Sequence, residues 1–557
     1  MHYLPEVDCE IPDLDLLTLL FESSYPWARE ATTIYAASED ETNNLTKAQV
    51  RTTVRRLAHV LRHEFGVGAQ GPEKDIVICI SSNQLLLPTI FFAVIGAEGI
   101  FSAASTAFTV PELVRQIEKT GSNLIVTSED TLHTALGAAR HCHIPLERVL
   151  ILQSMGHKRQ LKKSTNDGVN YLTRTAELQW ERITNPQILE RRVVALLFSS
   201  GTTGVPKAVC LSHKNFVAEA IITQAAIQMY LNRAKRQIRC NFRYRTIAHL
   251  PTAHIAGLQG YFINGIMAGG TVFWMAKFIF EDFLCAAKKH SITFLTTAPP
   301  VYLQIVKSSK VTDHFHSLLH AQSGAAPIGS DLLKLAQEKL RCNISQAWGL
   351  TETTGAVTWL PWDRSDLTAS ISQLLPNTRM KIVDDNDAPV EEGQRGEILV
   401  KGPNVTKGYF QNPEATEKAF TTDGWLRTGD IGLRKKGLFY IVDRKKELTK
   451  YKGLQIAPAE IEVLLVGNRK ILDAAVIGVQ DPKIPENEVP CAFIVQDPNE
   501  QAITVKEIDD YIRKNLADHK RLRGGVVFVD QIPKNMSGKI LRRELVEKAR
   551  AGKMAKL

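Results

Sequence analysis

Short apolar runs recur along the chain at intervals that leave room for a helix between them. The clearest four are rich in Val, Ile and Leu and lie at 75–80, 123–127, 148–152 and 292–296. Continuous runs of this kind are typical of parallel strands that are buried on both faces and joined by helices. The pattern predicts an α/β fold, and the 557 residues are enough for about two to four domains.

The pattern changes after residue 396. The segments 397–400 and 438–442 alternate apolar and polar residues, with turn signals at Gly402-Pro403 and Lys436-Gly437. Alternation of this kind predicts antiparallel strands with one solvated face. The polar segment 156–185 has no such pattern, so we expect an irregular surface excursion there.

A charged run at 443–447 resembles an exposed connector between domains. About 110 residues follow it, which is long enough for a small α+β domain. We therefore predict a large N-terminal domain over 1–445, built of α/β subdomains and a β-rich subdomain. A small C-terminal domain over 446–557 would follow it.

One uncharged stretch, 256–275, has the length that a bilayer requires. Gly269 and Gly270 divide it, and Gln259 and Asn264 interrupt its apolar face. We interpret it as a buried helix, a turn and a buried strand over 271–275, and we predict no membrane span.

Composition excludes several classes of protein. With 44% hydrophobic residues the chain is not intrinsically disordered as a whole, and the eight cysteines form no C-x-x-C pair. Scattered cysteines favour free thiols in a reducing compartment. The net charge of +9 is mild, and the basic segment 232–245 lacks aromatic repeats, so we expect a solvated loop and no nucleic-acid partner.

The segment 196–207 carries the first chemical signal. An apolar strand leads into a loop of glycine and hydroxyl residues that ends in lysine. Glycines let the backbone approach an anion, while hydroxyls, N–H groups and the lysine bind it. Pro206 precedes the lysine, so this is not a Walker A loop. The candidate phosphate-binding residues are Ser199, Ser200, Gly201, Thr202, Thr203, Gly204 and Lys207.

This loop resembles the signature of the adenylate-forming (AMP-binding) superfamily, which includes acyl-CoA synthetases, 4-coumarate:CoA ligases and firefly luciferases. Further motifs of that family follow in the expected order across nearly the whole chain, at 249–254, 322–327, 346–352, 424–430, 442–455 and 533–539.

The resemblance implies a two-step reaction with a small carboxylic acid, ATP and coenzyme A, supported by Mg²⁺. The carboxylate attacks the α-phosphate of ATP to form an acyl-adenylate, and a thiol then displaces AMP. Two unit charges 4 Å apart repel by about 4 kcal/mol at an effective dielectric constant near 20. The first step therefore needs positive charge and oriented donors at the reacting phosphorus.

By the resemblance, Lys539 bridges the carboxylate and the α-phosphate. Glu352, after Thr351, coordinates Mg²⁺ together with Thr203. Asp430 accepts hydrogen bonds from both ribose hydroxyls, and Arg444 helps to hold the ribose. His254 would lie between the phosphate and acyl sites, although a histidine of the core is the alternative.

The same comparison places Trp348, followed by Gly349, against adenine, where the family usually has Tyr or Phe. A wall shared by adenine and the acyl group would comprise Gly324, Ala325 and Ala326. Ala347 replaces the usual glycine, and its methyl group would narrow the acyl pocket.

Lys450, Lys452, Gly453 and Gln455 match positions associated with the thioester half-reaction. They lie in the same small domain as Lys539, and both sets need the same reacting carbon. We therefore expect a mobile C-terminal domain that swivels between the two half-reactions, with Lys446 as its hinge.

The last three residues, Ala555-Lys556-Leu557, resemble the Ser-Lys-Leu address that a peroxisomal import receptor reads. We expect a peroxisomal protein, and a cytoplasmic one if these residues are only a basic tail.

The resulting hypothesis is an ATP-dependent carboxylic acid:CoA ligase for an aryl, fatty or modified acyl substrate. A luciferase-like adenylate oxygenase is one alternative, and a ligase that loads a separate carrier protein is another. A non-catalytic relative is less favoured, because the charges of Lys207, Glu352, Asp430 and Lys539 are all present.

Overall fold

The computed structural model describes residues 2–156, 158–199, 206–234, 242–451, 454–481, 484, 488–535 and 538–550, with the backbone alone at 450, 454, 455 and 550. The predicted phosphate loop and the residues predicted for the thioester half-reaction therefore fall partly outside the described residues, and the predicted peroxisomal address at 555–557 falls wholly outside them.

A seven-stranded sheet organises the first part of the chain, in the order β7-β6-β5-β3-β4-β8-β9. Its five inner strands are parallel, and β7 and β9 are antiparallel edges. The bounds are β3 (Ile76–Ile80), β4 (Ile100–Ala104), β5 (Leu124–Thr127), β6 (Val149–Gln153), β7 (Gln160–Lys163), β8 (Val193–Ser199) and β9 (Lys207–Ser212).

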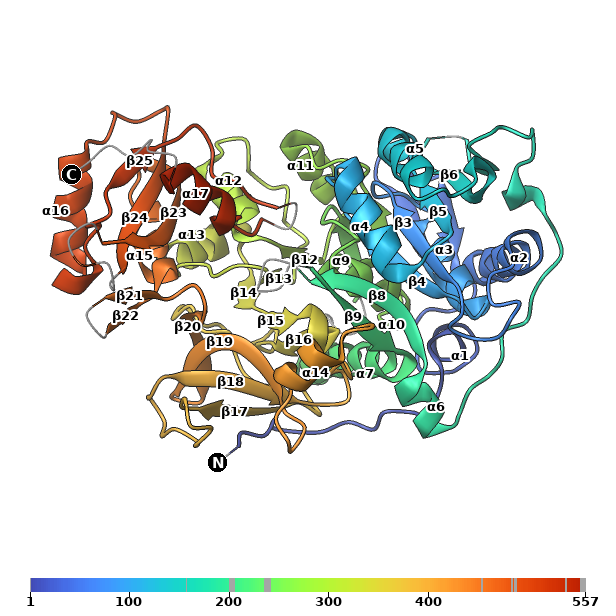
Figure 1. Ribbon diagram of the computed structural model, residues 1–557, viewed down its shortest axis with the longest axis horizontal. Helices are drawn as coiled ribbons and strands as arrows, with labels where there is room; N and C mark the ends of the chain where they lie inside the picture. Colours follow the sequence, from blue (N-terminus) through green and yellow to red (C-terminus); the bar gives the residue numbers. More distant parts are fainter. Residues whose placement is uncertain are drawn as a thin grey trace.

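Helices cover both faces of this sheet (Figure 1). Val77 and Cys79 of β3 pack in the core that includes α2 and α3, whereas Ile78 and Ile80 pack against α4 and α5. Successive strand residues point to opposite faces, which is why β3 is apolar throughout. These helices are α2 (Lys47–Phe65), α3 (Leu87–Gly96), α4 (Val110–Thr120) and α5 (Leu132–His141).

Local sequence signals end these helices. Thr46 forms a capping box with Gln49 at the start of α2, and Gly66 ends the helix with φ 74°. Gly121 ends α4 in the same left-handed conformation, with φ 68°. Glycine adopts this conformation without the steric penalty that a Cβ atom brings.

A second α/β layer follows, with its own core. Its sheets have the orders β10-β11-β1-β2 and β12-β13-β14. The strands are β1 (Thr33–Ala37), β2 (Asn44–Thr46), β10 (Arg245–Ala248), β11 (Thr271–Trp274), β12 (Phe294–Thr297), β13 (His320–Ser323) and β14 (Asn343–Gln346). Helices α11 (Phe280–Lys289), α12 (Pro299–Lys307) and α13 (Ser330–Leu340) pack in this core. The helices between the two layers pack instead on the core of the seven-stranded sheet; they are α7 (His213–Arg233), α9 (Ile255–Leu258), the π-helix η4 (Gln259–Ile263) and α10 (Asn264–Met267).

The β-rich subdomain is an antiparallel sheet in the order β17-β18-β19-β20, beside the hairpin β15-β16. Its strands are β15 (Trp348–Leu350), β16 (Gly355–Thr358), β17 (Arg379–Val383), β18 (Gly396–Lys401), β19 (Leu426–Lys435) and β20 (Leu438–Arg444). The shorter helices of the whole N-terminal domain are α1 (Leu16–Phe21), η1 (Glu129–Thr131), η2 (Leu146–Arg148), η3 (Tyr171–Thr173), α6 (Pro186–Arg191), η5 (Thr351–Thr353) and α14 (Pro413–Ala419).

The C-terminal domain is α+β. One face of β23–β24 packs on α15 and α16, and the other packs on α17. Its elements are β21 (Thr449–Tyr451), β22 (Leu454–Ile456), α15 (Pro458–Val466), β23 (Ile471–Gln480), β24 (Glu488–Gln496), α16 (Val505–Asn515), η6 (Asp518–Lys520), β25 (Val526–Phe528) and α17 (Arg542–Arg550).

The predicted α/β class is confirmed, as are the four buried strands and the two antiparallel ones. The stretch 256–275 forms helical turns, the Gly269-Gly270 turn and β11, as predicted. Among the described residues no helix is both long and apolar enough to cross a bilayer. The domain boundary at 445/446 stays a prediction.

Two expectations were wrong in part. The segment 156–185 is not wholly irregular, because it supplies the edge strand β7 and the buried Tyr171. The run 443–447 is exposed only at Lys445 and Lys446. Asp443 is 4% exposed, because its carboxylate accepts a hydrogen bond of 3.0 Å from the N–H of Ala459 at the start of α15.

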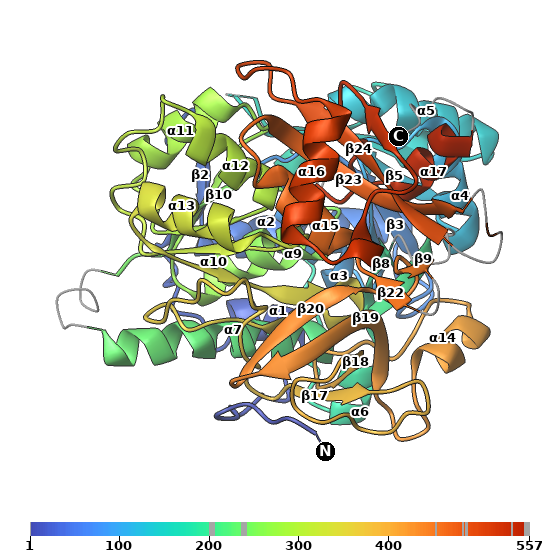
Figure 2. The same ribbon diagram turned by 90° about the vertical axis from the view of Figure 1, so that its left-hand side faces the viewer.

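The C-terminal domain lies beside α12 and α13 (Figures 1 and 2). Lys307, the last residue of α12, pairs with Asp497 after β24 at 2.6 Å. The side chain of Asp497 is 8% exposed and that of Lys307 is 32% exposed, so water partly screens this pair. A Cβ atom on Gly329, before α13, would lie 2.7 Å from Val463 of α15, so the two domains meet closely there.

We expect Lys307→Ala to loosen this docking. Losing an ion pair of this exposure should weaken the free energy of domain docking by about 1 kcal/mol. This corresponds to about a fivefold change in the docking equilibrium. Tryptic cleavage after the exposed Lys445 or Lys446 should accelerate by that factor. Lys310→Ala is the control, because its ion pair with Glu281 lies within one domain. Equal rates in both variants would contradict the docking role of Lys307.

Candidate active site

Strands β8 and β9 form a hairpin whose connecting loop is the predicted phosphate loop. Ser199 ends β8 and Lys207 begins β9, and the two residues are paired in register. The predicted loop residues Ser200, Gly201, Thr202, Thr203 and Gly204 lie outside the described residues. The structure therefore locates both ends of the loop at the carboxyl end of a parallel strand, where open α/β sheets bind their ligands.

Glu352 lies directly beside this hairpin. Thr351 and Glu352 begin the 3-10 helix η5, and the N–H of Thr406 donates to the carbonyl of Glu352 at 2.8 Å. The carboxylate oxygen Oε1 accepts hydrogen bonds from Ser199 Oγ and from Tyr409 Oη, both at 3.0 Å. Two motifs far apart in the sequence are thus joined by direct hydrogen bonds.

The sequence motifs did not identify Tyr409. Its ring lies under the Lys207 ammonium, 4.9 Å from the nitrogen to the ring centroid. Burial, the nearby charge of Glu352 and the hydrogen bond to it raise the pKa of Tyr409 well above its ordinary value, so the hydroxyl keeps its proton. No periodicity or motif marks this residue, because its role arises from contacts across the fold.

A second cluster surrounds Asp430, which is 3% exposed. Asp430 and Arg444 are cross-strand partners in β19 and β20, and Arg444 Nε lies 3.3 Å from Oδ1. The indole N–H of Trp348 donates to Oδ2 at 2.9 Å. Burial raises the pKa of Asp430, and the charge of Arg444 opposes this effect. Each carboxylate oxygen keeps a second lone pair for an incoming hydroxyl group.

The predicted role of Trp348 was that of an aromatic face. The structure adds a polar role that Phe, one of the usual family residues, does not have, because its ring carries no donor. Gly349 follows in β15, and a Cβ atom there would lie 1.8 Å from the carbonyl oxygen of Gly355 in β16. The close pairing of these two strands therefore requires glycine at 349.

Lys539 reaches the Asp430 cluster from the C-terminal domain. Asn535 Oδ1 accepts from the Lys539 N–H at 2.9 Å, and Gly538 has φ 84°. Burial, followed by the positive charge of Arg444, lowers the pKa of Lys539 to about 8, while Glu447 and Asp430 oppose this shift. The charges of Arg444 and Asp430 in the large domain therefore influence the protonation of Lys539 in the small domain.

His254 caps helix α9, where its Nδ1 accepts from the Ala256 N–H at 3.3 Å. Burial, followed by the charge of Lys539, lowers the pKa of His254 to about 4. The imidazole is therefore neutral near pH 7. His254 is only partly exposed and lies within electrostatic range of Lys539, and its role between the phosphate and acyl sites stays a prediction.

The predicted adenine wall is the turn between β13 and α13. Ala325 adopts φ 69° and is exposed, and Gly324 and Ala326 flank it. The N–H of Ala347 donates to the Ser323 carbonyl at 2.9 Å, so this turn lies next to Trp348. Their predicted roles toward adenine and the acyl group stay predictions.

Two of the residues predicted for the thioester half-reaction belong to the hairpin β21–β22 of the C-terminal domain. Lys450 and Gln455 are paired in register across the β21–β22 hairpin, whose first strand contacts β23 and β24. Lys452 and Gly453 lie outside the described residues. Lys446 is exposed in the turn between β20 and β21, and its hinge role stays a prediction.

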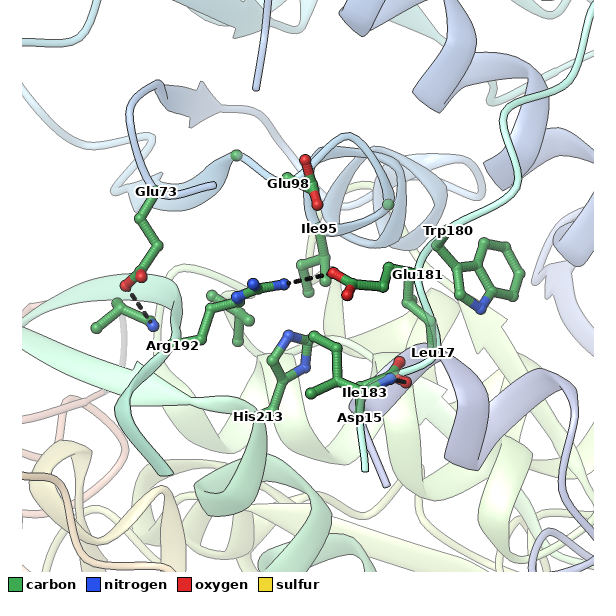
Figure 3. A pocket seen from close by; sticks show the side chains of 14 residues that line it. Asp15, Leu17, Glu73, Ile95, Glu98, Trp180, Glu181, Ile183, Arg192 and His213 are labelled. Carbon is green, nitrogen blue, oxygen red and sulfur yellow. Dashed lines mark hydrogen bonds and ion pairs between the residues drawn. The ribbon is translucent and has the colours of Figure 1, made fainter. Parts of the chain in front are cut away.

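A small cavity lies at the opposite end of β8 (Figure 3). Its volume of about 20 Å³ holds about one water molecule. Asp15, Arg192 and His213 line it, and Arg192 pairs with Glu181 at 3.3 Å. It also includes Val193, whereas the phosphate loop starts at Ser199, about 20 Å along the strand. This cavity is therefore separate from the predicted site.

The site contains one carboxylate suited to Mg²⁺. Oε1 of Glu352 is held by two hydroxyls, and no hydrogen bond among the described residues uses Oε2. These residues contain no group of three acidic, His or Cys side chains placed to hold a metal. One carboxylate is enough for Mg²⁺ in a nucleotide site, because the nucleotide phosphates and several water molecules supply its other ligands.

Comparisons with known proteins agree with this geometry. The profile of the family described as "AMP-binding enzyme" matches residues 24–410, and that of the "AMP-binding enzyme C-terminal domain" matches 460–539. A protein of Emericella nidulans named "Putative acyl-coenzyme A synthetase" is 53% identical over 559 residues and all of both chains. The resemblance seen in the motifs is confirmed.

Two further proteins are similar over nearly their whole length. The phenylacetyl-CoA ligase epaB of Aspergillus niger is 31% identical over 98% of this chain and 99% of its own. The crystal structure of ATP-bound MatB from Rhodopseudomonas palustris matches with a TM-score of 0.81, at 24% identity over 96% of this chain and 98% of that one. The latter shows that the fold is shared.

The pKa of Lys539 can be measured by pH-dependent labelling of its amine with acetic anhydride, read by mass spectrometry. Only the neutral amine reacts, so reactivity should reach half its maximum near pH 8. Arg444→Gln should move this midpoint upward, because it removes a nearby positive charge. Arg543→Gln, at a largely exposed neighbouring position, should leave it unchanged. A midpoint near 10.5 in the unmodified protein would contradict the buried, cation-flanked environment.

Proposed function

The chain belongs to the AMP-binding enzyme family, and we propose that it is an AMP-forming ligase that joins a carboxylic acid to coenzyme A. The observation that carries this proposal is the position of Lys539. The Lys539 ammonium of the small domain lies within electrostatic range of Asp430, Arg444 and His254 of the large domain. This arrangement supports the proposal, because a cation held there would offset the repulsion between two anionic reactants.

In the first half-reaction a carboxylate oxygen of the acid attacks the α-phosphorus of ATP. A P–O bond forms, the bond to the β-phosphate breaks, and pyrophosphate leaves. The Lys539 ammonium offsets the repulsion between the carboxylate and the phosphate, and Asp430 and Arg444 hold the ribose. Because His254 is neutral near pH 7, it can donate one hydrogen bond without adding charge.

The phosphate half of the site is formed by Ser199, Lys207 and Glu352. When Mg²⁺ is bound, it neutralises phosphate charge as the pyrophosphate leaves. Glu352 would hold the ion through its carboxylate, together with the predicted ligand Thr203. Lys207 is a point charge at the end of the loop, and the hairpin register keeps it beside Ser199.

In the second half-reaction the sulfur of coenzyme A attacks the carbonyl carbon of the acyl-adenylate. A C–S bond forms, the bond to the AMP oxygen breaks, and AMP leaves. We propose that Lys450, Lys452, Gly453 and Gln455 serve this step after the small domain has rotated about Lys446. The support is that the hairpin β21–β22, which carries Lys450 and Gln455, packs on β23 and β24 of the same small domain that carries Lys539, so one rotation would move both sets.

We propose an aryl, fatty or modified acyl carboxylate as the substrate. The 31% identity to a phenylacetyl-CoA ligase over 98% of the chain supports an aryl acid. The methyl group of Ala347, beside the turn after β13, favours a flat or narrow acyl group at this point of the pocket.

The proposal is tested with a panel of aryl and fatty acids supplied with ATP, Mg²⁺ and coenzyme A. The thioester product is identified by its mass, and ATP–pyrophosphate exchange reports the first half-reaction. We expect exchange and thioester formation with at least one class of acid. Oxygen uptake or light emission in place of a thioester would favour the oxygenase alternative, and no exchange with any acid would favour a non-catalytic relative.

Two variants should separate the half-reactions. Lys539→Ala should slow adenylation by about 10²–10³, which is the scale of losing one preorganised electrostatic group, and spare thioester formation from supplied acyl-adenylate. Lys446→Pro should preserve exchange but suppress the thioester, since proline fixes φ in the hinge. Equal losses in both assays would contradict the division of roles.

We also propose that Ala555-Lys556-Leu557 directs the protein to peroxisomes through an import receptor. A fluorescent protein that carries residues 553–557 at its C-terminus should colocalise with a peroxisomal marker in eukaryotic cells. The same fusion without Leu557 should remain diffuse. Equal distributions of the two fusions would contradict the proposal and leave the enzymatic function untouched.

A further inference from the structure

The segment 406–410 lies along the outer edge of β9. The N–H of Cys210 donates to the carbonyl of Gly408 at 3.0 Å, and the N–H of Phe410 donates to the carbonyl of Ala208 at 2.8 Å. Tyr409 is thereby bridged to Val209. The position of the Tyr409 backbone is therefore fixed by main-chain bonds that do not involve its side chain.

The side chain of Tyr409 contacts two charged residues that the family motifs place on the nucleotide. Its hydroxyl donates to Glu352 Oε1 at 3.0 Å, and its ring faces the Lys207 ammonium at 4.9 Å. Ser199 Oγ donates to the same carboxylate oxygen at 3.0 Å. Tyr409, which lies between the motifs at 346–352 and 424–430, thus links both charges of the phosphate half of the site.

The geometry distinguishes the two oxygens of Glu352. Oε1 receives two hydroxyl donors, which fixes the rotation of the carboxylate about its last bond. Within the described part of the chain no hydrogen bond is made to Oε2. Oε2 is thus the oxygen that the Glu352 carboxylate can offer to a hard cation such as Mg²⁺.

The ring has a separate effect on Lys207. An ammonium over an aromatic face is attracted by about 0.5–2 kcal/mol, which is weaker than its attraction to a polyphosphate. Lys207 is thus kept near the phosphate loop in the free protein and can still transfer to the nucleotide.

We infer that Tyr409 is a positioning residue for the Mg²⁺–nucleotide complex: its hydroxyl orients Glu352 toward the ion, and its ring holds Lys207 close to the phosphates. This inference rests on the proposed function. Outer partners of metal ligands orient the ligand, and their removal typically weakens metal affinity 10–100-fold.

The test measures metal binding without turnover. Mn²⁺ is titrated into the full-length protein saturated with α,β-methylene-ATP, and free Mn²⁺ is followed by electron paramagnetic resonance. Tyr409→Phe removes the hydroxyl and keeps the ring, so Mn²⁺ affinity should fall about tenfold. Nucleotide affinity without metal should stay unchanged, because the ring still holds Lys207.

Tyr409→Leu also removes the ring, and it should weaken metal-free nucleotide binding in addition. Tyr440→Phe is the matched control, since it deletes a hydroxyl that binds Thr368 at 2.8 Å on the exposed side of the β-rich subdomain. This control should bind Mn²⁺ and nucleotide as the unmodified protein does. Thermal unfolding of each variant establishes that it is folded.

Unchanged Mn²⁺ affinity in folded Tyr409→Phe would overturn the inference, as would an equal loss in Tyr440→Phe. A loss confined to the Tyr409 variants, with thioester formation from supplied acyl-adenylate preserved, would support it. The proposed function fails separately, if the unmodified protein binds the Mn²⁺–nucleotide complex but gives no exchange with any acid.

Discussion

The site depends on one half-buried ammonium group, that of Lys539, and on the charges around it. Burial and the charges of Arg444 and Arg542 disfavour its protonated form, while Glu447 and Asp430 favour it. The balance leaves the pKa at about 8, so the amine is mostly charged at neutral pH without being locked in a tight ion pair. A cation in this state can exchange its partners for a carboxylate and a phosphate at little cost.

The same charges join the connector to the small domain. Arg542 lies three residues after Lys539 and binds Glu447 at 2.7 Å, and it also pairs with Glu462 of α15. Burial raises the pKa of Glu447, but the charges of Arg542 and Arg444 outweigh this effect and lower it. The Lys539 loop, α15 and the end of the connector are thus held as one unit, which leaves Lys445 and Lys446 as the exposed residues of the turn.

The two halves of the site have different origins. The ribose half depends on cross-strand neighbours in β19 and β20 and on a lysine from the other domain. The phosphate half is built within the large domain, where β8–β9, η5 and the segment 406–410 meet. Movement of the small domain would therefore remove Lys539 and leave the Glu352 cluster assembled.

Much of this protein is determined by local sequence alone. Apolar runs such as 76–80 form buried strands because no other arrangement satisfies both their side chains and their backbone. Lys207 could be named from the glycine- and hydroxyl-rich loop that it ends, whereas Glu352, Asp430 and Lys539 could be named only because their motifs resemble those of a known family. The antiparallel pairing of 397–400 with the strand that carries Asp430 was only partly foreseen.

Only the tertiary structure decided which residues support those motifs. Tyr409 is 57 residues from Glu352, and the donation from Trp348 to Asp430 spans 82 residues. Asp443 reads as exposed in sequence because it is charged, yet it is buried at the start of α15. Hydrogen bonds and pKa shifts depend on distance in space, and a linear pattern carries no information on the packing that creates those distances.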